Sequence, residues 1–149
     1  MVINEIPEAE CAEILSRVSF GRLGCAHDNQ PYVVPVNFAY ESGDIYVIST
    51  LGQKIEWMRE NPRVCVLVDE IKSTSEWVSI VANGNYQELR EPQFTDERDH
   101  ARKLLVRPGR WGQAALAERQ LKTGNDLIAT IFFRIRLDSM TGLRATPEP

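Results

Sequence analysis

The chain has 149 residues, which suits one domain with a sizeable core, and 43% hydrophobic with 26% charged residues is typical of a globular protein. Lys and Arg number 17 against 21 Asp and Glu, and the net charge of −4 disfavours nucleic-acid binding, which usually leaves a basic footprint. Residues 1–149 are therefore predicted to form a single globular domain.

Cysteine and histidine are sparse. Cys11, Cys25 and Cys65 contain no C-x-x-C pair, and His27 and His100 are the only histidines, so we expect no metal site. Unpaired, widely spaced thiols suit a reducing cytosol. The first residues resemble no signal peptide, and no apolar run reaches the roughly 20 residues of a membrane helix. We therefore expect a cytoplasmic protein that does not enter a membrane.

Hydrophobic periodicity predicts the elements in chain order. A helix opens the chain, because Cys11, Ile14, Leu15 and Val18 recur at helical spacing. Later helices are predicted over 54–61, from about 95 to 105, and over 113–121. Six segments have the apolar alternation or continuous apolar runs of strands: 21–27, 32–40, 44–49, 64–68, 77–89 and 128–137.

Three of these strands carry further signals. Pro35 cannot donate to a ladder, so it marks a sheet edge, a bulge or an opening. The continuous apolar run from Val64 to Val68 indicates a strand buried on both faces. Gly84 indicates a bulge in a curved sheet. Six strands joined mostly by hairpins predict a mainly β fold, a six-stranded antiparallel barrel with peripheral helices.

The segment from Ser49 to Lys54 is the best candidate site, because a strand becomes a helix there. Free N–H groups at a helix start attract an anion, and Gly52 permits close approach of the backbone. Ser49 and Thr50 supply hydroxyl donors, and Lys54 supplies a charge suited to phosphate. The alternative is a polar turn with a solvated lysine.

Other candidates are open to two interpretations. Trp77, followed by Ser79 on the same strand face, either stacks on a planar ligand or fills the core. Trp111, in the loop 107–112, either closes over an anionic aromatic ligand or packs under a helix. Arg134 and Arg136 share a strand face and are expected to meet solvent or acidic partners, with a ligand role as the alternative. The acidic stretch 88–97 is interpreted as a solvated connection.

An ordered set of motifs resembles a known family. The motifs are Phe20-Gly21-Arg22-Leu23-Gly24, Pro31-Tyr32-Val33-Val34-Pro35-Val36, Asp44-Ile45-Tyr46, Gly52-Gln53-Lys54, Asn61-Pro62-Arg63-Val64, Trp77-Val78-Ser79-Ile80 and Gly84. Together they span nearly the whole chain, in an order similar to that of the pyridoxamine 5'-phosphate oxidase-like, FMN-binding split β-barrels, nearest the nitroimidazole-resistance branch.

The resemblance implies a homodimer with two flavin sites at the subunit interface. It implies that the backbone of Val34, Pro35, Val36 and Asn37 lines the flavin ring, and that Ser49, Thr50, Gly52 and Lys54 hold its phosphate. It also implies that the strand of Trp77 and Ser79 reaches the site, often from the partner subunit, with Trp111 as a further candidate. FMN is the expected cofactor, and FAD is the alternative.

The sequence departs from the best-studied relatives at two places. Ile48 stands where the nitroimidazole branch often has a histidine, and the C-terminal Arg/His substrate pair of the oxidase is not reproduced in 134–142. We therefore expect a flavin-dependent oxidoreductase that acts on a small molecule other than pyridoxamine phosphate, with the flavin carrying the redox chemistry. A non-catalytic flavin carrier and a cofactor-free interaction barrel are the alternatives.

Overall fold

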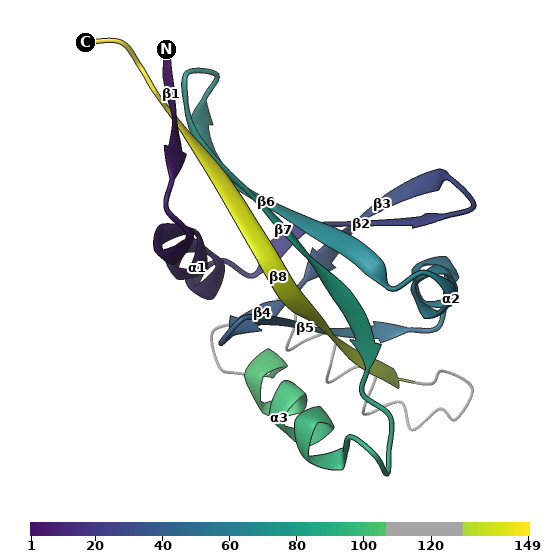
Figure 1. The fold of residues 1–149 in the computed structure, drawn as a ribbon. Coiled ribbons are helices and arrows are strands. Elements are labelled where there is room, and N and C mark those ends of the chain that lie inside the picture. Colours follow the sequence, from purple (N-terminus) through teal and green to yellow (C-terminus); the bar gives the residue numbers. More distant parts are fainter. Residues whose placement is uncertain (107–129) are drawn as a thin grey trace.

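The computed structural model describes residues 1–106 and 130–149, and this part of the chain contains eight strands and three helices (Figure 1). The strands are β1 (Val2–Ile6), β2 (Phe20–His27), β3 (Gln30–Asn37), β4 (Ala39–Glu41), β5 (Asp44–Thr50), β6 (Arg63–Ser73), β7 (Glu76–Glu88) and β8 (Thr130–Thr146). The helices are α1 (Glu8–Arg17), α2 (Gln53–Glu60) and α3 (Thr95–Leu105). None of these helices is long and apolar enough to cross a membrane.

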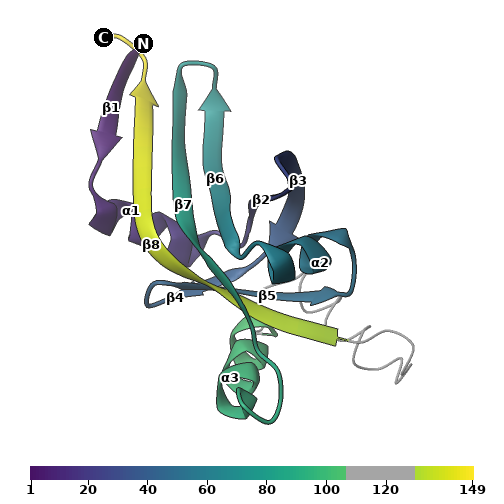
Figure 2. The same cartoon turned by 45° about the vertical axis from the view of Figure 1, so that its right-hand side comes forward.

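All eight strands belong to one antiparallel sheet. The order is β3-β2-β6-β7-β8-β5-β4, and β1 pairs separately with the end of β8. Figure 2 shows the sheet curling, so that β5 crosses below the long strands; α3 lies below β5, and α2 lies above β5 beside β3. The prediction of a mainly β, antiparallel split barrel with peripheral helices is confirmed.

The strand count and several bounds of the prediction are wrong. The chain opens with β1 rather than with a helix, because Val2–Ile6 pairs with the far end of β8, a contact that local periodicity cannot reveal. The predicted strand 32–40 is interrupted at Phe38, which separates β3 from β4. β8 continues to Thr146, far beyond the predicted end at Leu137. The predicted helix 113–121 lies outside the described residues.

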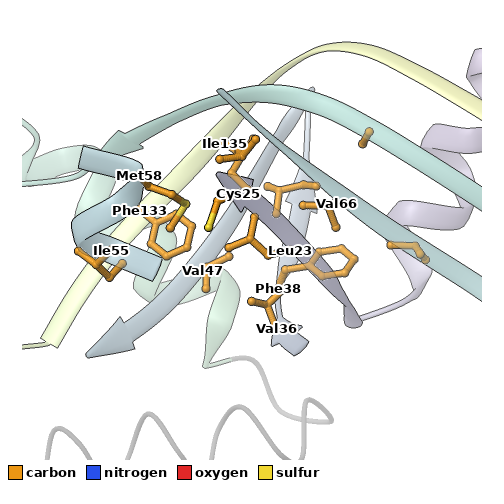
Figure 3. Packing of buried hydrophobic residues seen from close by; sticks show 14 of the residues in the cluster. Leu23, Cys25, Val36, Phe38, Val47, Ile55, Met58, Val66, Phe133 and Ile135 are labelled. Carbon is orange, nitrogen blue, oxygen red and sulfur yellow. The ribbon is translucent and has the colours of Figure 1, made fainter. Parts of the chain in front are cut away.

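The main core fills the inside of the barrel. Figure 3 shows Leu23 of β2, Val47 of β5 and Phe133 of β8 meeting there with Phe38, which lies between β3 and β4, and all four are almost fully buried. A second apolar cluster lies between α3 and the outer face of β5 and β8, where Ile48 packs. Because alternate residues of β5 serve the two clusters, nearly every side chain of this strand is buried.

The prediction that β6 is buried on both faces is wrong. Val64, Val66 and Val68 point into the core, but Leu67 on the opposite face is 36% exposed. An uninterrupted apolar run cannot by itself distinguish a strand covered on both sides from one with a bare apolar face. The outer face of β6 therefore carries the exposed apolar side chains of Leu67 and Ile71 in the single chain, beside the charged Arg63 and Asp69.

A bulge at Gly84 bends the two longest strands. The ladder between β7 and β8 shifts register here, since Asn83 pairs with Ser139 while Gly84 pairs with Leu137. The predicted bulge is thus confirmed. The backbones approach so closely that a Cβ on Gly84 would lie 2.3 Å from the carbonyl oxygen of Arg136. Only glycine fits at this contact without a shift of the backbone.

We expect Gly84→Ala to lower the free energy of unfolding by at least about 3 kcal/mol, because the added methyl collides with backbone rather than with a movable side chain. Gly52→Ala is the matched control, since an added Cβ there meets nothing within 4 Å, and its loss should stay below about 1 kcal/mol. Urea unfolding measures both. Equal losses in the two variants would contradict the role of Gly84.

Candidate functional site

The barrel is split between β3 and β5. Among the described strands β3 pairs only with β2. The ladder between β4 and β5 ends at the pair Ala39–Tyr46. Continuing that register would place Asn37 opposite Ile48 and Val36 opposite Ser49, but the ladder stops although β3 and β5 remain close. Among the described strands the facing edges of β3 and β5 therefore have no ladder partner.

Pro35 explains why β3 can be an edge. It pairs with Arg22 of β2, and its side chain is exposed. A proline has no N–H to offer to a further strand, so its position at the split agrees with the prediction of an edge or an opening. Val34, Val36 and Asn37 lie on the same strand, and Val36 is the most buried of them.

The turn from Ser49 to Lys54 closes one end of the split. α2 begins at Gln53, and its N-cap residue, Gly52, has no side chain that could cap the first N–H groups. The Oγ of Ser49 is buried and donates to the carbonyl oxygen of Thr50 at 3.1 Å. Ser49 and Thr50 point to opposite faces of β5, as successive strand residues must. Backbone N–H groups at the helix start are therefore the donors that this turn presents together.

Lys54 lies in the first turn of α2 and is partly buried. Burial lowers the pKa of its ammonium group, an effect that the nearby Cys25 thiol partly offsets. Within residues 1–106 and 130–149 the ammonium group has no hydrogen bond or ion pair. A partly desolvated cation that has no counter-ion in the described part of the chain, at the start of a helix, is suited to an anionic ligand.

Two other predicted site residues lie far from this turn. Ser49 pairs with Ile131 near the start of β8, whereas Trp77 pairs with Ala145 near its end. Ser79, which pairs with Leu143, is also near that end. The structure therefore brings the β3 edge and the Ser49–Lys54 turn together within one chain, but not Trp77 or Ser79. Trp111 lies outside the described residues.

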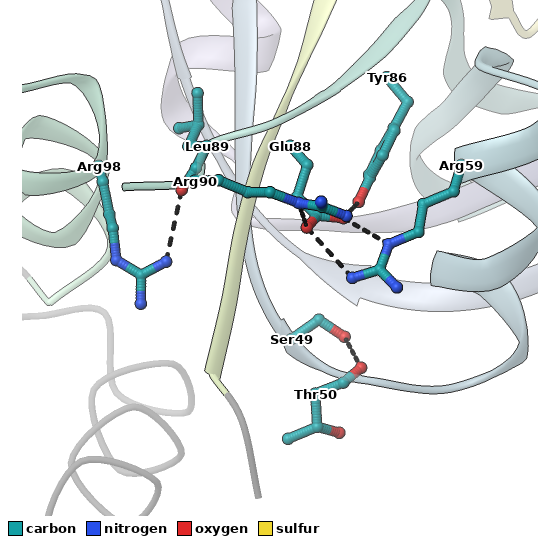
Figure 4. Close-up of polar contacts among 8 residues, drawn as sticks. All are labelled: Ser49, Thr50, Arg59, Tyr86, Glu88, Leu89, Arg90 and Arg98. Carbon is teal, nitrogen blue, oxygen red and sulfur yellow. Dashed lines mark hydrogen bonds and ion pairs between the residues drawn. The ribbon is translucent and has the colours of Figure 1, made fainter. Parts of the chain in front are cut away.

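Glu88, at the end of β7, is the centre of a polar network beside the turn (Figure 4). Arg59 of α2 donates to its two carboxylate oxygens at 2.8 and 3.1 Å, and Tyr86 donates to it at 2.6 Å. Arg90 also donates to it. The side chain of Glu88 is only 12% exposed, so the expectation of a solvated acidic connection at 88–97 is wrong for this residue.

These hydrogen bonds decide the ionisation of Glu88. Burial raises its pKa, but the donors Arg59, Arg90 and Tyr86 together outweigh burial and lower the pKa to about 2. Burial, with the hydrogen bond to Glu88 as a second cause, raises the pKa of the Tyr86 hydroxyl. The carboxylate stays charged, and the phenol stays neutral, at any ordinary pH.

Sequence reasoning missed this network, because its members are spread over α2, β7 and the segment after it. The only available signal was the alternation of Tyr86 and Glu88 on one face of the strand. The expectation for Arg134 is also wrong, since its guanidinium is buried and donates to Gln87 Oε1 at 2.7 Å. Arg136, as expected, is exposed and faces the acidic Asp44 at 3.5 Å.

We expect Glu88→Gln to reduce the free energy of unfolding at pH 7 by about 2–3 kcal/mol, because a buried carboxylate with a lowered pKa stabilises the folded state when ionised. This stabilisation is present above the ordinary pKa of 4.5 and is lost as the pH falls toward 2. Acid unfolding of the variant should therefore be less steep over that range. The exposed Glu91→Gln is the control, and parallel pH profiles of Glu88→Gln and wild type would contradict the expectation.

Comparison with known proteins places the chain in a family. A protein of Rhizobium meliloti described as uncharacterised is 36% identical over 146 residues, covering 97% of both chains. The crystal structure of a protein from Mesorhizobium loti described as FAD-binding is 36% identical, with a TM-score of 0.77 and 99% coverage of both chains. The FAD-binding protein of Mycobacterium smegmatis has the same fold at 20% identity, with a TM-score of 0.64 and coverage of 93% and 97%.

The family model described as pyridoxamine 5'-phosphate oxidase matches residues 7–144. This range includes both edges of the split, the Ser49–Lys54 turn and the Glu88 network. The matched range and the 36% identical relative together show that the chain belongs to the pyridoxamine 5'-phosphate oxidase family.

Proposed function

We propose that the chain binds a flavin nucleotide, with FMN as the smallest sufficient ligand. The observation that carries this proposal is the partly buried Lys54 at the start of α2, where the split ends, which has no ion pair among the described residues. The ring lies along Val34–Asn37, and the first phosphate meets the N–H groups of the helix start and the Lys54 ammonium. A relative of 36% identity described as FAD-binding supports the flavin as ligand.

The proposed reaction is a flavin-dependent oxidation or reduction of a small molecule. The flavin supplies the hydride and electron chemistry when bound, and the protein binds and orients it. Ile48 is packed under α3 in the second apolar cluster, so the position at which some relatives have a histidine is here part of the core. We therefore propose a substrate other than a nitroimidazole or pyridoxamine phosphate.

The visible spectrum of the purified protein, followed by mass analysis of any released cofactor, tests flavin binding. A protein that takes up neither FMN nor FAD contradicts it. Reduction of the bound flavin by a nicotinamide donor, followed by reoxidation with varied acceptors, tests the oxidoreductase proposal. A flavin that is bound but never reduced favours the carrier alternative.

We expect Lys54→Met to weaken FMN binding at least about tenfold, because a charge-assisted contact to phosphate is lost. The free energy of unfolding of the apoprotein should be unchanged or higher, since the variant removes a partly desolvated charge that has no partner within residues 1–106 and 130–149. Lys103→Met, at an exposed position on α3, is the control and should change neither quantity. An unchanged FMN affinity of Lys54→Met would exclude the lysine from the phosphate site.

We also propose that the chain acts as a homodimer. The outer face of the sheet carries Val33 and Leu143, which are 64% and 42% exposed. Leu67 of β6 and its ladder partner Val81 of β7 lie between them. Trp77 and Ser79 have the same parity as Val81 along β7 and so share this face. A second chain that covers the face would protect its apolar side chains and could receive Trp77 near its own split.

We expect Leu67→Asp to produce monomers and to weaken flavin binding together with the dimer, because a charge at the centre of an apolar interface is costly. Gln93→Asp, in the exposed segment before α3, is the control for added negative charge. Sedimentation equilibrium and flavin titration measure the two effects. A wild-type protein that is monomeric at micromolar concentration would contradict the proposed assembly.

A further inference from the structure

Among the described strands, the two edges of the split are joined by strand pairing at one end only. Beyond Asn37 the chain passes through Phe38 into β4, which pairs with β5. At the other end, the ladder between β2 and β6 stops at Gly24, and the rest of the β2–β3 hairpin diverges from β6 (Figure 1). The position of this part of β3 relative to the turn at Lys54 therefore depends on side-chain contacts.

The last turn of α2 makes these contacts. Trp57 stacks on the imidazole of His27 at the end of β2, with the ring centroids 5.5 Å apart and the planes 28° from parallel. Tyr32 of β3 meets the same indole edge-on, also at 5.5 Å. The Nδ2 of Asn61, directly after α2, donates to the carbonyl oxygen of Ala26 at 3.0 Å. Both strands of the hairpin are thus attached to the same end of one helix.

His27 adds a polar contact with the helix. Because a carboxylate can only accept a hydrogen bond, the Nε2 of His27 donates to the carboxylate of Glu60, the last residue of α2. Its Nδ1 faces Asp28, in the hairpin's own turn, at 3.4 Å. The imidazole therefore contacts α2 in two ways, through its ring face and through Nε2.

The same helix carries the candidate phosphate site at its other end. α2 has eight residues and is therefore about 12 Å long. Ile55 and Met58 are fully buried and fix the helix on the main core, so it is a rigid link between its two ends. A hairpin that moved away from the end of α2 would change the distance between β3 and Lys54.

We propose that His27 is a positioning residue of the flavin site, which holds β3 at the distance from the start of α2 that a flavin requires. The inference rests on the flavin site proposed above and concerns its geometry. The ring along β3 and the phosphate at the helix start belong to one molecule, so both bind well only when the two parts of the site are correctly spaced. His27 acts through Trp57 and Glu60 rather than by contact with the flavin.

Titration of the apoprotein with FMN and with riboflavin, which has the ring without the phosphate, tests this role. His27→Ala should weaken FMN binding at least about fivefold and riboflavin binding less than about twofold, because only FMN spans both parts of the site. The side chains of His27 and Glu60 are 31% and 68% exposed, so the urea midpoint of the apoprotein should change little.

Two further variants complete the comparison. Glu60→Ala removes only the polar contact and should cause a smaller loss of the same kind, and its exposed position keeps the test available if His27→Ala fails to fold. Asp28→Asn is the matched control, because Asp28 faces the imidazole without joining it to α2, and it should change neither affinity.

A combination with Lys54→Met gives a second measurement. If His27 serves the placement of the phosphate, His27→Ala should cost much less FMN affinity in the Lys54→Met background than in the wild type. Equal losses of FMN and riboflavin affinity, additive losses in the double variant, or unchanged FMN affinity in both His27→Ala and Glu60→Ala overturn the proposal. A wild type that binds neither ligand contradicts the flavin site itself.

Discussion

β8 is hydrogen-bonded to β1, β5 and β7, and the arrangement of the whole molecule depends on this strand. A straight strand of 17 residues could not belong to the barrel at one end and to an open sheet at the other. The bulge opposite Gly84 provides the bend, because it adds one residue to β8 and strengthens the local twist. The close approach of the Arg136 carbonyl to Gly84 is the steric consequence of this geometry.

The same strand separates the two groups of candidate site residues. The Ser49–Lys54 turn lies beside the start of β8, and Trp77 lies beside its end. No rearrangement of side chains could bring them together within one chain. A site that needs both must therefore combine two chains, and the bare apolar face around Leu67 is a surface on which such an assembly can form.

Electrostatics sets the chemical character of the region around the turn. Glu88 is ionised and holds Arg59 and Arg90 in fixed positions, while Lys54 and Arg98 lack acidic partners among the described residues. The chain as a whole is acidic, with a net charge of −4, so this local excess of cations is not a property of the general composition. Such a local excess of cations favours an anionic ligand.

Local patterns in the sequence were sufficient for the mainly β class, the edge at Pro35, the bulge at Gly84 and the turn around Lys54, since proline, glycine and period-two alternation act through the backbone near them. Tertiary structure alone decided the pairing of β1 with the end of β8 and the bare face of β6. It also decided the low exposure of Glu88. Each of these depends on segments distant in sequence, and periodicity reports which residues are apolar without reporting what covers them.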